Sequence, residues 1–96
     1  MLITKGVAAG EVITLKLTSG EELVAKLVEE TDDSYKLSHP QGIGMGPSGT
    51  GLMPYLFTVS QDRDVKLLKK TVTVAEPTDK TFADQFIEST TGIKLA

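Results

Sequence analysis

The sequence predicts a mostly β domain of antiparallel strands that ends in a short α-helix. Three observations lead to this fold class. Residues 11–19 alternate between apolar and polar side chains, which is typical of a strand with one buried face. A Ser-Gly turn follows and leads into a second apolar segment, as in a β-hairpin. Near the C-terminus, an apolar stripe has the spacing of one helix face: Phe82, Ala83, Phe86 and Ile87.

The first hairpin is the clearest element of the sequence. Its first strand places Ile13, Leu15 and Leu17 on one face. Gly20 tolerates the positive φ that a tight turn requires. The partner strand is predicted over residues 22–30. A helix is the alternative there, because Glu, Ala, Lys and Leu favour helices, but the tight turn after a clear strand favours the hairpin.

The middle of the chain is less regular. A polar turn at residues 31–34 precedes a third strand at residues 35–38. His39 and Pro40 interrupt this strand, because proline lacks an N–H and occurs at edges and bulges of sheets. Residues 41–51 contain five glycines and are predicted to be a loop or an irregular strand.

Three more short strands are predicted at residues 51–60, 65–68 and 71–75, with Lys69 and Lys70 between the last two. The first of them presents alternate apolar residues on one face: Met53, Tyr55, Phe57 and Val59.

A helix is predicted at about residues 79–91, with Thr78 or Asp79 as its N-cap and Gly92 at its C-terminal end. Residues 1–96 are expected to form a single domain, with the strands between about residues 11 and 76.

The composition limits the possible functions. The chain has no Cys, so disulfides and thiolate metal sites are excluded. A net charge of −3 argues against a general nucleic-acid binder, although a local basic site is compatible with it. No segment has the run of roughly 18 apolar residues that a membrane span needs. Lys5 interrupts the first apolar run, which does not resemble a signal peptide, and we expect a cytoplasmic protein without a membrane partner.

Residues 46–51, Gly-Pro-Ser-Gly-Thr-Gly, match the first part of a phosphate-binding loop. The signature then requires Lys and Ser or Thr, whereas this chain has Leu52 and Met53. The segment also leads into a predicted strand instead of a helix. We therefore expect a loop between strands here and no nucleotide binding.

No pattern typical of an enzyme is present. His39 is the only histidine, and no nucleophile or further metal ligand lies near it in the sequence. Four carboxylates lie close together, but without the spacing of a calcium loop, and are expected to be solvated at a hairpin tip: Glu29, Glu30, Asp32 and Asp33. We expect a non-enzymatic protein with no metal and no cofactor.

The order of these strands and turns along the chain resembles that of the Sm-like (LSm) family of small β-barrels. The first Sm motif begins with a strand that ends in a polar residue and Gly. A second strand that carries Leu pairs with it, and an Asp-containing turn then leads to a third strand, which also carries Leu. The similarity covers about residues 11–38, whereas residues 51–76 match only in outline. The residues that carry it are Val12, Leu15, Leu17, Gly20, Leu23, Leu27, Asp32 or Asp33, and Leu37.

The chain departs from the family pattern at four points. The stretch from Gly20 to Leu37 is slightly shorter than in the family, so the Asp turn is tighter. Ser34 or Tyr35 stands where the Asn after the motif Asp is usual. Lys69 and Lys70 replace the Arg-Gly of the second motif. The usual N-terminal helix is absent, and the predicted helix is C-terminal. The overall pattern is also similar to small uncharacterised proteins of T4-like bacteriophages, including cyanophages.

The resemblance implies a five-stranded, strongly bent antiparallel barrel, with the helix of this chain appended at its C-terminus. It also implies a homo-oligomeric ring in which the fourth strand of one subunit pairs with the fifth strand of the next. Sm rings bind single-stranded, often uridine-rich RNA at turns that line the pore. By position those residues are Asp32, Asp33, Ser34, Tyr35, Lys69 and Lys70. In the alternative, prompted by the missing Arg-Gly pair and a pI near 5.0, the ring is structural or binds proteins and does not bind RNA. A phage protein of either kind would act in the host cytoplasm.

Overall fold

The computed structural model describes residues 7–47 and 49–92. Six strands and one α-helix lie in these residues, with a 3-10 turn between the last two strands. The elements are β1 (Val12–Leu17), β2 (Glu22–Glu30), β3 (Ser34–Gly46), β4 (Gly49–Pro54), β5 (Val65–Leu68), η1 (Lys69–Thr71), β6 (Val72–Pro77) and α1 (Lys80–Thr91). All the strand pairs are antiparallel, which confirms the predicted mostly β class with a C-terminal helix.

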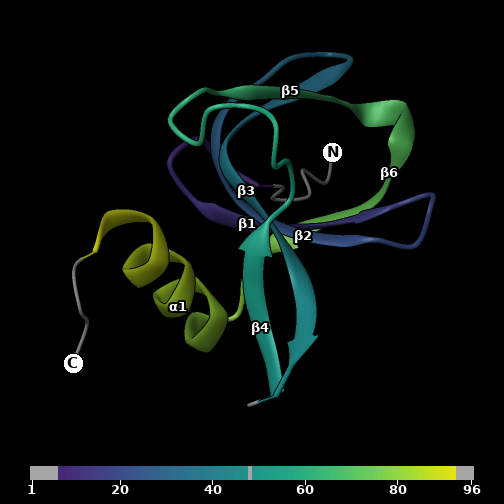
Figure 1. Ribbon diagram of the computed structural model, residues 1–96. Coiled ribbons are helices and arrows are strands. Elements are labelled where there is room, and N and C mark those ends of the chain that lie inside the picture. The colour runs from purple at the N-terminus through teal and green to yellow at the C-terminus, as the bar shows by residue number, and fades with distance from the viewer. Residues whose placement is uncertain (1–6, 48, 93–96) are drawn as a thin grey trace.

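The strands form one sheet in the order β4-β3-β2-β1-β6, and β5 also pairs with β3. Within the described ranges no strand ladder joins β5 to β6, and the two strands diverge from η1 (Figure 1). The five strands that the Sm resemblance implies are therefore corrected to six, and the sheet of the described residues does not close.

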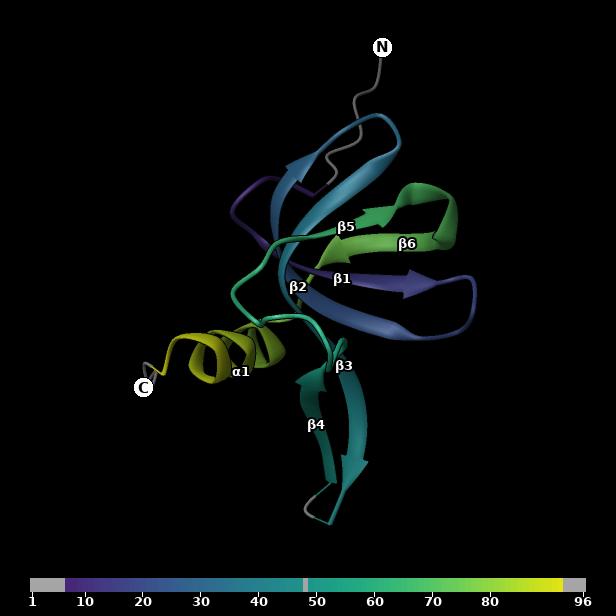
Figure 2. The ribbon, with the colours of Figure 1, turned by 45° about the horizontal axis from the view of Figure 1, so that its top comes forward.

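The sixth strand comes from the glycine-rich segment. β3 continues past Pro40 and pairs with β4, from Gln41 opposite Pro54 to Gly46 opposite Gly49. We call this hairpin, residues 41–54, the arm; it projects away from the rest of the sheet (Figure 2). Of the two alternatives predicted for residues 41–51, a loop or an irregular strand, the structure shows a strand on each side of the hairpin. Cross-strand pairing outweighs the low strand propensity of glycine.

A bulge at His39 and Pro40 lets β3 pass through the predicted interruption. Val24 of β2 pairs with Gln41, and Lys26 pairs with Ser38, so two steps along β2 match three along β3. His39 has a φ of 52°, which is unusual for a residue other than glycine. The bulge was one of the two explanations predicted for this proline.

The predicted strand at residues 51–60 ends early, at Pro54. The chain then forms a loop in which the Gln61 side chain donates a hydrogen bond to the carbonyl of Leu56, at 2.9 Å. Phe57 was predicted to lie on the apolar face of a strand but is 76% exposed. The alternation of apolar residues in this segment therefore does not mark a buried face.

The core lies on the inner face of the sheet, where β1, β2 and the first half of β3 supply alternate apolar residues. Leu15 is fully buried at the centre, opposite Leu23 of β2 and Ala75 of β6. The buried members of this cluster are Ile13, Leu15, Leu17, Leu23, Ala25, Leu27 and Leu37. The alternation predicted for the first hairpin is thus confirmed.

Helix α1 packs against β1 and β2 on the outer face of the sheet. Asp79 is its N-cap and accepts a hydrogen bond from the backbone N–H of Thr81, while Gly92 ends it with a φ of 76°. Phe86 on the helix and Val24 on β2 are both buried. In the part of the chain that the structure describes, no helix is long and apolar enough to cross a membrane.

Replacing Leu15 by Ala should lower the free energy of unfolding by about 2–5 kcal/mol, because the change leaves a cavity in the centre of the core. The adjacent Lys16→Ala is the control, since its side chain is exposed and should matter by less than about 0.5 kcal/mol. Urea denaturation followed by circular dichroism measures both. Equal losses for the two variants would contradict the assignment of the inner face.

Candidate functional site

The structure brings together the two turns that the sequence singled out. One joins β2 to β3 at residues 31–34, which we call the β2–β3 turn, and the other is η1. β5 runs antiparallel to the start of β3, with Leu68 opposite Ser34 and Leu67 opposite Tyr35. The end of β5 therefore reaches the β2–β3 turn, where the backbone N–H of Lys69 donates to the carbonyl of Asp33 at 2.8 Å.

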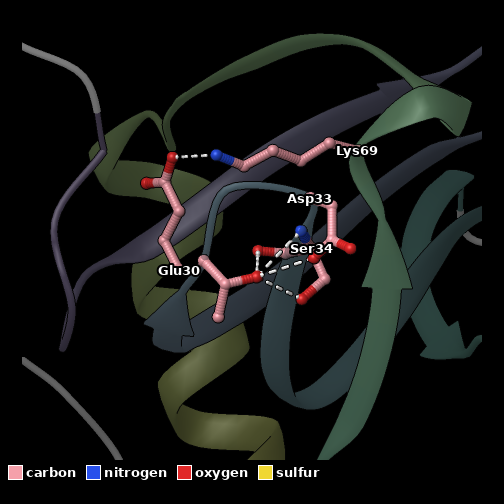
Figure 3. Close-up of polar contacts among 5 residues, drawn as sticks. Glu30, Asp33, Ser34 and Lys69 are labelled. Atoms are coloured by element: carbon pink, nitrogen blue, oxygen red, sulfur yellow. Dashed lines mark hydrogen bonds and ion pairs between the residues drawn. The ribbon is translucent and has the colours of Figure 1, made fainter.

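The Thr31 hydroxyl organises the β2–β3 turn through contacts with Asp33 and Ser34, both labelled in Figure 3. It accepts a hydrogen bond from the backbone N–H of Ser34 at 3.1 Å and lies 2.7 Å from the Ser34 hydroxyl. It also lies 3.0 Å from a carboxylate oxygen of Asp33, to which it can donate. Ser34 is only 4% exposed. Of the predicted site residues, Ser34 and Asp33 thus shape the turn, a role that the Thr31 hydroxyl makes possible.

Lys69 extends from η1 across the start of β3. Its ammonium Nζ lies 2.6 Å from a carboxylate oxygen of Glu30, the last residue of β2, and 5.2 Å from the centroid of the Tyr35 ring. The second distance is within the range of a cation–π contact. The hydrogen bond to Glu30 is the main cause that raises the pKa of Lys69 above its usual value, and the charge of Asp32 adds to it.

Glu30 is the member of this site that the sequence did not identify. We expected it to be solvated at a hairpin tip, but it forms an ion pair with a lysine 39 residues away. Its position follows from the strand register, which sets Glu30 opposite Tyr35. Only the pairing of β2 with β3 and of β3 with β5 places these three side chains together.

The remaining predicted residues lie at the surface around a hollow of about 490 Å³. Asp32 and Lys70 are both exposed there. The hollow is lined by Asp32, Asp33, Leu68, Lys69 and Lys70. With Glu30 included, two lysines face three carboxylates, so the site has a formal charge of −1. An anionic ligand that binds here must therefore compete with the three carboxylates for the two lysines.

The other candidates of the sequence lie apart from these turns. The Nδ1 atom of His39 is 2.8 Å from the hydroxyl of Ser38. Residues 46–51 lie at the tip of the arm, and Ser48 is outside the described residues. Among the residues that are described, no group of three or more His, Asp and Glu side chains has the arrangement of a metal site. That the chain is not an enzyme stays a prediction.

Comparison of the chain with family models, with curated proteins and with solved structures finds no match. The function proposed for the two turns therefore rests on their contacts, their charges and the resemblance of the sequence to Sm-like proteins.

We expect Glu30→Gln to lower the pKa of Lys69 toward the ordinary value of 10.5, because the amide is neutral and a weaker hydrogen-bond acceptor. A raised pKa in the folded state also means that this contact stabilises the protein below pH 10.5 and that the stabilisation is lost as the pH rises through the folded value. NMR titration of the lysine side chains measures the shift. Glu29→Gln, the same change one residue away, should leave Lys69 as it is; an equal shift in both variants would contradict the assignment.

Proposed function

We propose that this chain forms an Sm-like homo-oligomeric ring that binds single-stranded RNA at the β2–β3 turn and η1. The observation that carries the proposal is the meeting of these two turns around Tyr35, Lys69 and Lys70. Turns far apart in the sequence converge where the Sm resemblance places the nucleotide, and they present an aromatic ring together with cations.

The order of the strands supports the Sm-like part of the proposal. With β4 set aside as the return strand of the arm, the other five follow the order that the resemblance implies. They are connected by the Ser-Gly turn, the Asp turn, the glycine-rich segment and the short basic turn. The arm is then an insertion between the third and fourth of these five strands.

The edges of the sheet support assembly. Within the described part of the chain, β5 pairs only with β3 and β6 pairs only with β1, so each strand has an open edge. Leu68 of β5 is 40% exposed and Val74 of β6 is 47% exposed. Open edges with apolar side chains favour pairing with another chain. Pairing β5 of one copy with β6 of the next satisfies both edges and repeats the same contact around a ring.

The chemistry of the two turns suits single-stranded RNA. Such RNA is bound by stacking its bases on aromatic rings and by placing cations against its phosphates. Tyr35 supplies the ring, and Lys69 and Lys70 supply the cations. In a ring, each subunit would contribute one copy of this site, so successive nucleotides would meet identical sites.

Wild-type protein should bind short oligo-U at low salt, and Lys69→Ala combined with Lys70→Ala should weaken the binding. Each phosphate contact on a single strand contributes about 0.7 to the slope of log affinity against log salt, so losing two contacts should flatten the slope by about 1.4. Fluorescence anisotropy at several salt concentrations measures both quantities.

The matched control is Lys36→Ala combined with Lys66→Ala. These two lysines are opposite each other on β3 and β5, and Lys36 points to the face of the sheet away from Tyr35. The control removes the same charge at another place. No oligo-U binding at low salt, or equal losses in the two double variants, would contradict RNA binding at the turns.

Light scattering should give a mass several times that of the 10.3 kDa chain. Val74→Asp should reduce it toward the monomer, because a carboxylate at the open edge of β6 opposes pairing with a second strand. Met45→Asp is the control: this residue is 82% exposed on the arm, outside the proposed contact. A monomeric wild-type protein would remove the ring from the proposal.

The arm favours a second candidate, a ring that binds another protein and no RNA. Residues 40–61 contain no charged side chain, in a chain that is 24% charged. Met45, Met53 and Phe57 are 82%, 47% and 76% exposed in or next to the arm. An exposed apolar surface without charges is typical of protein contacts.

Purification from the native host distinguishes the two candidates. A defined protein partner that is lost in Met45→Asp, retained in the double variant of Lys69 and Lys70, and free of nucleic acid would support the protein-binding ring. Copurifying RNA with a high ratio of absorbance at 260 and 280 nm would count against it.

A further inference from the structure

We infer that Glu30 competes with the ligand for Lys69: it holds this lysine across the Tyr35 ring in the free protein, and RNA must displace it. The inference rests on the proposed RNA binding and concerns how the same site is regulated. It assigns a role to a residue that the sequence pattern left among the solvated carboxylates.

The geometry places three side chains in one row. The strand register sets Glu30 opposite Tyr35, and Lys69 reaches over the ring to the carboxylate. The ammonium lies 2.6 Å from Glu30 and 5.2 Å from the ring centroid (Figure 3 shows the ion pair). In this state the positive charge of Lys69 is balanced by the Glu30 carboxylate, and the lysine covers one face of the tyrosine ring.

Both groups that RNA needs are therefore already engaged. A base can stack on the covered face of Tyr35 only after Lys69 leaves it. A phosphate can take Lys69 only in exchange for the Glu30 carboxylate, since both are anions that hydrogen-bond to the same ammonium. The two exchanges are linked, because the same movement of Lys69 frees the ring and offers the cation.

The competition should be moderate. The side chains of Lys69 and Glu30 are 28% and 39% exposed, and ion pairs with this much contact with water are weak. Releasing Lys69 should therefore raise the affinity for RNA by about 1.5- to fivefold. An effect of this size would tune binding without switching it on or off.

The test compares oligo-U binding by four proteins: the wild type, Glu30→Gln, Glu29→Gln and Lys69→Ala. Glu29 is the matched control, because it is exposed, precedes Glu30 on β2 and lies opposite Lys36 instead of Tyr35. Both Gln variants remove one negative charge. Glu30→Gln should bind about 1.5 to five times more tightly than Glu29→Gln.

A fifth protein, Glu30→Gln in the Lys69→Ala background, shows whether the effect passes through the lysine. There the Glu30 substitution should have only the small effect of Glu29→Gln. A gain that is equal in the two single Gln variants, or that persists without Lys69, overturns the inference and leaves RNA binding intact. If none of the five proteins binds oligo-U, the proposed function fails and the inference fails with it.

Discussion

The bend in β3 is the constraint on which the rest of this structure depends. Pro40 has no backbone N–H, and His39 before it adopts a φ of 52°. The resulting bulge turns one strand into two segments with different partners: residues 34–37 pair with β5, and residues 41–46 pair with β4. On the other side, β2 pairs with the first segment and with Gln41 and Gly42 at the start of the second. Without the bend, the start of β3 could not carry β5 while its end formed the arm.

That single bend also separates the two surfaces on which the proposed functions rest. The first segment of β3 brings η1 to the β2–β3 turn and so assembles the site around Tyr35. The second segment carries the uncharged arm away from it (Figure 2). Lys69 and Lys70 therefore lie on one part of the molecule, and the exposed Met45 and Met53 lie on another. The two turns therefore support the proposed RNA binding, and the arm supports the alternative of protein binding.

In the site itself, positive and negative side chains nearly cancel. Two lysines face three carboxylates, and the closest contact, between Lys69 and Glu30 at 2.6 Å, is internal. A strongly basic surface would bind many polyanions with little selectivity. In the proposed function, a lysine held by its own carboxylate would favour ligands that offer both a phosphate and a base to stack.

Local patterns in the sequence were sufficient wherever the structure depends on near neighbours. The alternation in the first hairpin predicted the inner face of β1 and β2, and Asp79 and Gly92 predicted the ends of α1. These predictions were confirmed because side chains two residues apart on a strand lie on the same face, and because the unpaired backbone groups at the ends of a helix need capping residues. The position of the bulge belongs here too, since the lack of an N–H in Pro40 is a local property.

Elsewhere the tertiary structure decided. The glycines of the arm left a loop and an irregular strand open as alternatives, and the pairing of β3 with β4 decided for a strand. The apolar alternation continues to Val59, but β4 ends at Pro54, where the chain leaves the sheet. The sequence singled out the two turns, Tyr35 and both lysines, but not Glu30. Its role depends on two strand registers that bring residues 39 positions apart within 2.6 Å, and no local pattern specifies such long-range pairing.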